Sequence, residues 1–267
     1  MFRCVRDVLA DDGTLWLNIG DSYAANRGYQ VPSTKGGTKH GPGQAVGGKS
    51  SVVPVGLKPK DLIGIPWLLA FALRADGWYL RQDIIWHKPN PMPESVRDRC
   101  TKAHEYIFLL SKSERYFFDS EAMKEPAVSE KPAGNRTHRG ATADANGEIG
   151  HRTKAGLANL RGVKWTTRNR RSVWTVATRP YKGAHFATFP PALIEPCILA
   201  GSRPSDIVLD PFMGSGTTAA VALQHGRQYL GCELNAEYGA LQAERINEAT
   251  EAAACAAAQP DLFERAA

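Results

Sequence analysis

The apolar residues of the first half of the chain follow a helical spacing and then an alternating one. Residues 2–9 have the spacing of an amphipathic helix, and the turn DDG leads from it into a strand predicted at 14–19. Helical spacing returns over Pro59–Arg74, and Gly77 marks the predicted end of that helix. Three further strands are predicted, at 78–87, 104–111 and 115–118.

The second half alternates strands with helices, a pattern typical of an α/β fold with a parallel sheet. Its predicted elements are a short strand at 172–177, a helix at 190–200, a strand at 207–210, a helix to about 225, a strand at 229–232 and an Ala-rich helix at 236–257. The tail 259–267 is predicted to fray.

Two segments between these predicted elements cannot contribute to a core. Residues 24–56 contain eight glycines and three prolines and predict a mobile loop, which is either a tolerated insertion or a lid over a substrate. The segment HKPNPMPES, residues 87–95, has three prolines in nine residues and is excluded from the interior of a sheet.

At 267 residues and 43% hydrophobic composition, the chain is long enough to bury one sizeable core. No apolar run approaches the roughly 18 residues that a membrane span requires, and the N-terminus is too acidic for a secretory signal. We therefore expect a cytoplasmic protein. The cysteines lack metal-ligand spacing and are predicted to be buried, reduced thiols; they are residues 4, 100, 197, 232 and 255.

The positive charge is concentrated in one strip, residues 121–172. This basic strip carries eleven Lys or Arg and five acidic residues, an excess of six that equals the net charge of the whole chain, +6. A cationic strip with few apolar residues and one tryptophan, Trp165, suits a nucleic-acid backbone, because Lys and Arg displace condensed counterions. The composition also fits a solvated loop, and the two interpretations agree if the strip orders on binding.

The most informative segment is IVLDPFMGSGTT, residues 207–218. A buried strand that ends at Asp210 and turns through Gly214 and Gly216 lets backbone approach a small molecule at the carboxyl edge of a parallel sheet. The next strand ends at Glu233, whose carboxylate can accept bonds from both hydroxyls of a ribose. Together these features predict a nucleoside cofactor site.

The type of cofactor follows from what the turn contains. No lysine follows the glycines, which argues against a phosphate-binding loop. Ala219 takes the place of the third glycine of the dinucleotide pattern, which tolerates it. A carboxylate at Asp210 repels a pyrophosphate but can hold the ammonium of a methionine moiety, so S-adenosylmethionine is favoured over NAD. A nicotinamide-dependent oxidoreductase and a purely structural turn are the alternatives.

Residues 11–244 as a whole resemble the β-class DNA amino-methyltransferases of bacteria and phages, in which the target-base half precedes the cofactor half. Seven segments follow that family's order, and HFATFP with DPFMGSGTT is the most specific pair. The segments are DDGTLWLNIGDSY (11–23), GLKPKDLIGIPW (56–67), DGWYLRQDIIWHKPNPMPES (76–95), KAHEYIFLLSKSERYFFD (102–119), HFATFPPALIEPCILAG (185–201), VLDPFMGSGTT (208–218) and YLGCELNAEY (229–238).

The resemblance implies a Rossmann-like α/β methyltransferase fold and site-specific transfer of a methyl group from S-adenosylmethionine to an amino group of cytosine or adenine in double-stranded DNA, as in restriction-modification. The expected cofactor-binding residues are Asp210, Pro211, Phe212, Gly214, Gly216, Thr217, Glu233, Asn235, Phe186, Thr188 and Phe189. The cationic residues expected to contact DNA are Lys88, Lys164, Arg168, Arg170 and Arg171.

The family's catalytic tetrapeptide, Asp/Ser/Asn-Pro-Pro-Tyr/Phe, does not occur in this sequence. The only Pro-Pro pair, Pro190 and Pro191, belongs to the cofactor side and fits the first turn of a helix. Asp21 is a weak catalytic candidate, and holding its own loop by bonds to the backbone is the alternative. His87 and Lys88 are candidates for lining the base pocket. Trp86, which precedes them, is a candidate for the same role or for core packing.

In the family's sheet, the strand that carries the tetrapeptide lies between the strands predicted at 207–210 and 14–19. We therefore expect an incomplete sheet with two exposed strand edges, self-association or a separate N-terminal fragment as partner, and an N-terminally truncated or misassigned start. A catalytically inactive cofactor- and DNA-binding fragment is the alternative to an active enzyme. The expected organisation is a target-base half (1–120), a basic target-recognition insert (121–172), a cofactor half (173–258) and the tail (259–267).

Overall fold

The computed structural model describes residues 1–24, 53, 56–127, 166–178 and 189–258. Most of the predicted loop 24–56, the middle of the basic strip, the segment 179–188 and the predicted tail lie outside these ranges. Three predicted site residues, Lys164, Phe186 and Thr188, also fall outside them.

The first half of the chain and residues 173–175 form a four-stranded mixed sheet. Its elements and the helices that belong to it are α1 (Phe2–Val8), β1 (Thr14–Ile19), α2 (Ile65–Ala75), β2 (Tyr79–His87), β3 (His104–Ser111) and β6 (Val173–Thr175). The strand order is β1-β3-β2-β6, with β3 antiparallel to both neighbours and β6 parallel to β2. β1, β2 and β6 therefore run in one direction, and their carboxyl ends lie at the same edge of the sheet.

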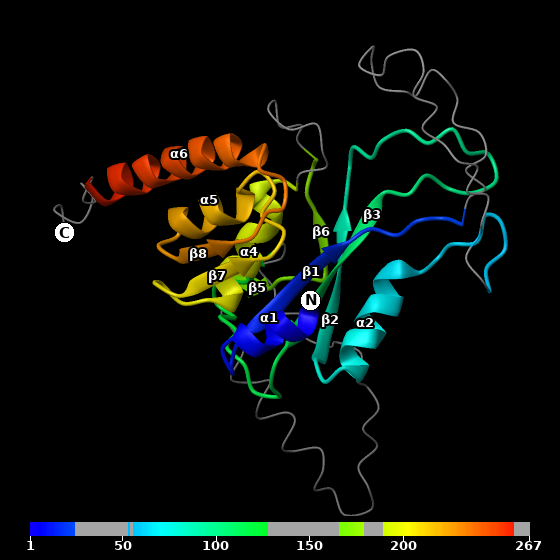
Figure 1. Cartoon of the computed structure of the whole chain (residues 1–267), viewed down its shortest axis with the longest axis horizontal. Coiled ribbons are helices and arrows are strands. Elements are labelled where there is room, and N and C mark those ends of the chain that lie inside the picture. Colours follow the sequence, from blue (N-terminus) through cyan, green and yellow to red (C-terminus); the bar gives the residue numbers. More distant parts are fainter. Residues whose placement is uncertain (25–52, 54–55, 128–165, 179–188, 259–267) are drawn as a thin grey trace, which may run out of the picture.

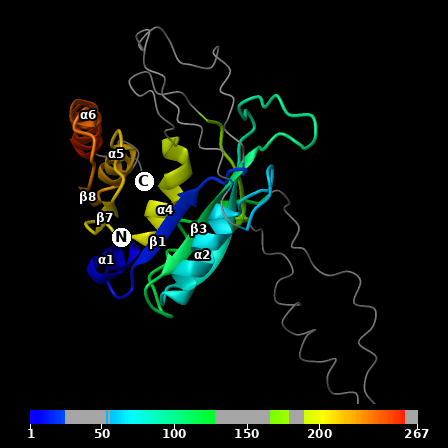
Figure 2. The same ribbon diagram turned by 45° about the vertical axis from the view of Figure 1, so that its right-hand side comes forward.

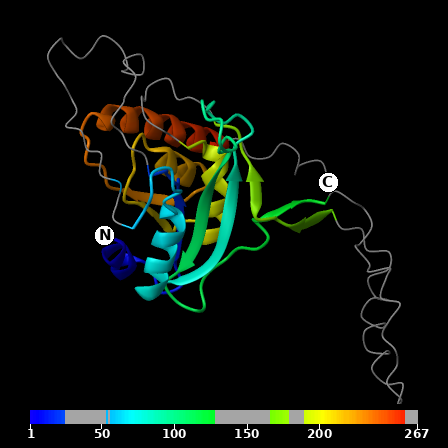
Figure 3. The same ribbon diagram turned by 90° about the vertical axis from the view of Figure 1, so that its right-hand side faces the viewer.

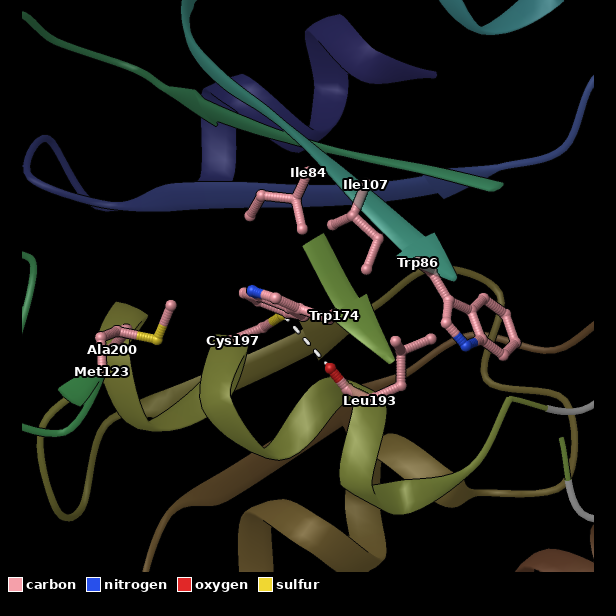
Figure 4. Packing of buried hydrophobic residues seen from close by; sticks show 8 residues of the cluster. All are labelled: Ile84, Trp86, Ile107, Met123, Trp174, Leu193, Cys197 and Ala200. Atoms are coloured by element: carbon pink, nitrogen blue, oxygen red, sulfur yellow. Dashed lines mark hydrogen bonds between the residues drawn. The ribbon is translucent and has the colours of Figure 1, made fainter. Parts of the chain in front are cut away.

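Neighbouring residues of each strand face opposite sides of this sheet, and each side is covered by a helix (Figure 2). On one side, Phe108 and Leu110 of β3 pack in a cluster with residues of α2 and with apolar residues of α1. On the other side, Ile107 of β3 and Trp174 of β6 pack with Cys197 of α4 (Pro191–Gly201), as Figure 4 shows. The core thus consists of two apolar layers separated by the sheet.

The second half places a two-stranded parallel sheet beside the first (Figure 1). Its elements are β7 (Ile207–Asp210), α5 (Thr217–Gln224), β8 (Gln228–Gly231) and α6 (Tyr238–Ala258). α5 packs on both strands, α6 packs on α5, and α4 contacts α5 while also covering the four-stranded sheet. None of the helices in the described ranges combines the length and apolar character of a membrane span.

β1 and β7 each have one edge without a ladder partner among the described residues. In those ranges β1 pairs only with β3, and β7 pairs only with β8. The two sheets are connected instead through α4 and through an ion pair of 2.9 Å between Asp12 and Arg203. Among the described residues, no strand pairs with both β1 and β7.

The predicted start of the second helix was wrong, because α2 begins at Ile65 and not at Pro59. Lys60 and Gly64 have φ values of 75° and 79°, which no α-helical residue can adopt. The predicted end was correct, since Gly77 follows α2 with a φ of 94°.

The strand predicted at 115–118 does not form. Phe117 donates its backbone N–H to the carbonyl of Asp12 at 2.8 Å, outside any ladder, and the ring of Phe118 stacks on Trp16 at 6.4 Å. The aromatic residues of this segment therefore do not belong to a strand, and the ring of Phe118 packs against β1.

The prediction of buried thiols was wrong for four of the five cysteines. All are free, but only Cys197 is buried, in the layer between α4 and the sheet. The exposed ones are Cys4, Cys100, Cys232 and Cys255.

The basic strip contains a strand pair that the sequence pattern did not predict. β4 (Lys124–Pro126) and β5 (Thr167–Asn169) form an antiparallel ribbon, with Glu125 opposite Arg168. Figure 3 shows this ribbon projecting from the body of the molecule. Strands of three residues are too short to display an alternating pattern.

Candidate functional site

The turn between β7 and α5 is organised by the carboxylate of Asp210. Its Oδ1 accepts the backbone N–H of Phe212 at 2.9 Å, and its Oδ2 accepts the hydroxyl of Thr218 at 2.5 Å. Gly214 and Gly216 follow with φ values of 50° and 81°, a region that favours glycine. The acid and the two glycines therefore form the tight turn that the sequence predicted.

Glu233 closes this turn from the end of the neighbouring strand. Its Oε2 accepts the backbone N–H of Gly214 at 2.8 Å, and its Oε1 accepts that of Asn235 at 2.8 Å. These two N–H groups, Asn235 first, hold the pKa of the exposed Glu233 carboxyl below its ordinary value. The side chain is thus kept ionised, and each oxygen retains a lone pair that can accept a ligand hydroxyl.

Two residues of α6 donate hydrogen bonds to the turn, and the sequence analysis predicted neither. Gln242 donates its side-chain N–H to the carbonyl of Gly214 at 2.7 Å. Arg245 donates to the hydroxyl of Ser215 at 2.9 Å and to that of Thr217. The sequence feature that could have indicated this support is a pair of long polar residues, three positions apart, in a helix otherwise rich in alanine.

A glycine at the end of β8 makes room for the turn. A Cβ at Gly231 would lie 1.8 Å from Sδ of Met213 and 2.9 Å from its Cγ. Met213 is buried between the turn and the strand, and its N–H bonds the carbonyl of Cys232 at 2.9 Å. The close approach of the two strand ends therefore depends on Gly231.

The other described residues of the predicted cofactor site differ in their surroundings. Pro211 and Phe212 lie in the turn, and the Phe212 side chain is 62% exposed. Phe189 precedes α4 and packs against the apolar cluster between that helix and the sheet.

Asp21, the weak catalytic candidate, holds the start of α2. Its Oδ1 accepts the N–H groups of Ser22 at 2.8 Å and of Gly64 and Ile65 at 3.0 Å each. The side chain thus accepts hydrogen bonds from free donors at a helix N-terminus. This supports the alternative role of Asp21, which is to hold its own loop through bonds to the backbone.

The residues at the end of β2 are engaged within the protein. Trp86 is buried and donates its indole N–H to the carbonyl of Val176 at 2.8 Å, which supports the core reading of this residue. Lys88 forms an ion pair with Glu105 and lies 4.2 Å from the centre of the Trp86 ring. His87 Nδ1 lies 3.1 Å from the hydroxyl of Thr175.

The model of the DNA methylase family matches residues 1–244, most of the chain. The chain belongs to this family. It is 50% identical over 247 residues to the type II methyltransferase M.XycI of Xanthomonas campestris pv. cyanopsidis, which covers 92% of this chain and 69% of that relative. It is 49% identical to the type II methyltransferase M.SmaI of Serratia marcescens, over 92% of this chain and 71% of the relative.

Solved structures of DNA methylases share the fold. The PvuII cytosine-N4-specific DNA methyltransferase superposes with a TM-score of 0.56 at 19% identity, over 93% of this chain and 71% of that one. A putative DNA modification methylase of Thermus thermophilus, in complex with S-adenosyl-L-methionine, gives 0.54 at 22% identity, over 93% and 74%. The prediction of a Rossmann-like methyltransferase fold is thereby confirmed.

In this methylase, the cations predicted to contact DNA do not form a single free cluster among the described residues. Arg168 pairs with Glu125 across the β4–β5 ribbon at 2.8 Å, and Arg170 lies over the Trp174 ring at 4.7 Å. Arg171 is exposed, and its carbonyl accepts the indole N–H of Trp174 at 2.8 Å. Residues 170–172 of the basic strip therefore lead directly into β6 of the sheet.

Proposed function

We propose that this DNA methylase is a site-specific DNA methyltransferase that uses S-adenosylmethionine to methylate an exocyclic amino group of cytosine or adenine. The observation that carries the proposal is the bond between Gly214 and Glu233, which joins a glycine turn and an ionised acid at the carboxyl ends of adjacent parallel strands. Membership of the DNA methylase family and the cofactor bound to the Thermus protein support the same conclusion.

Different residues of the site bind different parts of the cofactor. Glu233 accepts the ribose hydroxyls through the oxygen lone pairs that its two backbone donors leave free. Asp210, with Pro211 and Phe212 in the turn, holds the methionine end of the cofactor. Gly214 and Gly216 let the backbone of the turn approach the cofactor closely. When bound, the cofactor supplies a methyl group activated by a sulfonium.

The DNA side of the site lies at the carboxyl edge of the four-stranded sheet. The target nucleotide has to leave the stack before its amino group can be reached, so the protein must hold both the base and its flanking backbone. We assign target recognition to the insert 121–172, base binding to 1–120 and cofactor binding to 173–258. Arg168, Arg170, Arg171, Lys164 and Lys88 are the proposed DNA contacts of that assignment.

Methyl transfer also requires hydrogen-bond acceptors for the two hydrogens of the amino group of the target base. The family's tetrapeptide is absent from residues 1–267, and the described β1 and β7 are each paired on one side only. We propose that a strand bearing these acceptors pairs between β1 and β7 in the active enzyme, as a separate fragment or as an added segment.

Calorimetric titration tests the cofactor assignment directly. We expect the chain to bind S-adenosylmethionine and its demethylated product, and to bind NAD far more weakly, because Asp210 repels a pyrophosphate. A folded chain that binds NAD as well as S-adenosylmethionine, or binds neither, would overturn the assignment.

A further inference from the structure

A cavity of about 910 Å³ lies beside the proposed DNA side of the site. Its walls come from the segment after β1, which includes Tyr23, and from the loop between β2 and β3, which includes Arg97, Asp98 and Arg99; Lys60 completes it. Because β1 and β2 run in the same direction, both segments leave the sheet at its carboxyl edge. The cavity therefore opens at the edge where the target base is proposed to bind.

The loop between β2 and β3 is held in place at its base. The N–H of Lys88 bonds the carbonyl of Ala103 at 2.8 Å. The Asn90 side chain donates to the carbonyl of Thr178 and accepts its N–H, each at 3.0 Å. With three prolines in residues 87–95, the first part of the loop also has little backbone freedom.

Two of the three cations that line the cavity are paired with carboxylates. Lys60 bonds Asp98 at 2.6 Å, and Arg99 bonds Glu94 at 2.5 Å while its guanidinium lies 3.9 Å from the centre of the Tyr23 ring. The pairing with Lys60 lowers the pKa of the Asp98 carboxyl, which therefore remains ionised at neutral pH.

Arg97 is the cation that remains. Its side chain is exposed, and it has no ion pair or hydrogen bond within the described residues. The charged residues that line the cavity are Lys60, Arg97, Asp98 and Arg99. Because Asp98 pairs with Lys60 and Glu94, outside the lining, pairs with Arg99, one positive charge remains, at Arg97. A guanidinium offers five N–H donors in a planar fork that fits two oxygens of one phosphate.

We propose that Arg97 binds a backbone phosphate of the substrate DNA, with the Arg99–Tyr23 pair as the fixed wall beside it. The proposal rests on the proposed function and adds a contact outside the basic strip. A phosphate contact positions the duplex without reading its sequence. Arg97 thus fixes the strand beside the flipped nucleotide and is a positioning residue.

Binding of a labelled duplex at several salt concentrations, followed by fluorescence anisotropy, tests this contact. We expect Arg97→Ala to weaken binding about tenfold at low salt and to reduce the salt slope by about 0.9, the value for one phosphate contact. The loss should be equal for two duplexes of unrelated sequence. Arg97→Lys, which keeps the charge, should retain most of the slope.

Arg115→Ala is the matched control. Arg115 is also exposed, but it follows β3, whose carboxyl end lies at the opposite edge of the sheet from those of β1 and β2. We expect its removal to leave the salt slope unchanged. All three variants should keep the wild-type affinity for S-adenosylmethionine, which shows that they are folded.

The possible results separate this inference from the proposed function. If the wild-type chain binds DNA and Arg97→Ala has the wild-type slope, the phosphate contact is wrong and the proposed function stands. A loss confined to one duplex sequence also overturns it, because Arg97 would then read a base. A folded wild-type chain that binds S-adenosylmethionine but no DNA overturns both.

Discussion

Gly214 donates its backbone N–H to Oε2 of Glu233 at 2.8 Å, and this bond joins the turn after β7 to the segment after β8. The same carboxylate accepts the N–H of Asn235, so one side chain fixes both walls of the proposed cofactor site before any ligand binds. Such preorganisation favours binding, because the acceptor does not have to be ordered when the ligand arrives.

Removal of this acid should weaken cofactor binding. In Glu233→Ala the ribose hydroxyls lose their acceptor and the turn loses its tie to β8, so we expect affinity for S-adenosylmethionine to fall about ten- to a hundredfold. Titration calorimetry measures the change. Glu237→Ala removes the same charge from an exposed side chain nearby and should bind as wild type. Equal affinities for wild type and Glu233→Ala would refute the role of Glu233.

The low pKa of Glu233 sets the pH range of this interaction. Backbone donors stabilise the ionised form, so the folded-state pKa lies below the ordinary 4.5. The contribution of the carboxylate is therefore complete above 4.5 and is lost as pH falls through the lower, folded-state value. We expect affinity measured from about pH 8 to about pH 3 to show an acid loss, confined to the lower end of this range, that Glu233→Gln lacks. A step between about pH 7 and about pH 5, present only in wild type, would contradict this.

Gly231 should be intolerant of any side chain. In Gly231→Ala the new Cβ meets the Sδ, Cγ and Cβ of buried Met213 at 1.8, 2.9 and 3.1 Å, so Met213 must leave its site. We expect a loss of about 1 to 3 kcal/mol in the free energy of unfolding by urea. Gly239→Ala in α6 meets nothing within 4 Å and should be neutral or slightly stabilising. A Gly231→Ala chain as stable as Gly239→Ala would show that the turn can shift.

The accuracy of the sequence predictions depended on whether the deciding contacts were local. The strand, acid and glycines of 207–218 are adjacent in the chain and form the predicted strand and turn, although the strand is not buried as predicted, since Ile207 is 63% exposed. The start of α2 is set by Asp21, which lies 43 residues before Gly64, and no periodicity contains that bond. Arg168 is likewise 43 residues from Glu125, so neither the ribbon nor the ion pair could be predicted from spacing.

The support of the turn by α6 was missed for the same reason. Gln242 reaches the carbonyl of Gly214 across 28 positions of sequence, and Arg245 reaches Ser215 across 30. The sequence identified which residues form the turn, but not which helix holds it. Contacts of this kind follow from the packing of α6 on α5, which depends on the whole fold.

Residues 166–172, at the C-terminal end of the basic strip, should contribute to DNA binding. Replacing Arg168, Arg170 and Arg171 with alanine should weaken binding to any duplex and reduce the salt slope by about 0.9 for each lost phosphate contact. Arg168 is held in β5 by the ribbon with β4, and Arg170 and Arg171 directly precede β6, so their contribution does not depend on the rest of the strip. The triple lysine variant retains the charges and should keep most of the slope. An unchanged slope in the alanine variant would favour a solvated loop.

Methyl transfer should require more than residues 1–267. The only Pro-Pro pair of the sequence, Pro190 and Pro191, begins α4, and Asp21 accepts three backbone N–H groups, two of them at the start of α2. We therefore expect the purified chain to bind S-adenosylmethionine but to transfer no labelled methyl to duplex DNA, and to self-associate through its exposed strand edges.

A segment that carries Ser-Pro-Pro-Tyr or Asp-Pro-Pro-Tyr, added before Met1 or supplied as a separate fragment, should restore transfer and reduce self-association together. The two effects are coupled because one strand would fill the edges of β1 and β7 and also bring the amino acceptors. The same segment with its Ser or Asp replaced by alanine should correct self-association only. Methyl transfer by residues 1–267 alone, abolished in Asp21→Asn, would instead assign the chemistry to Asp21.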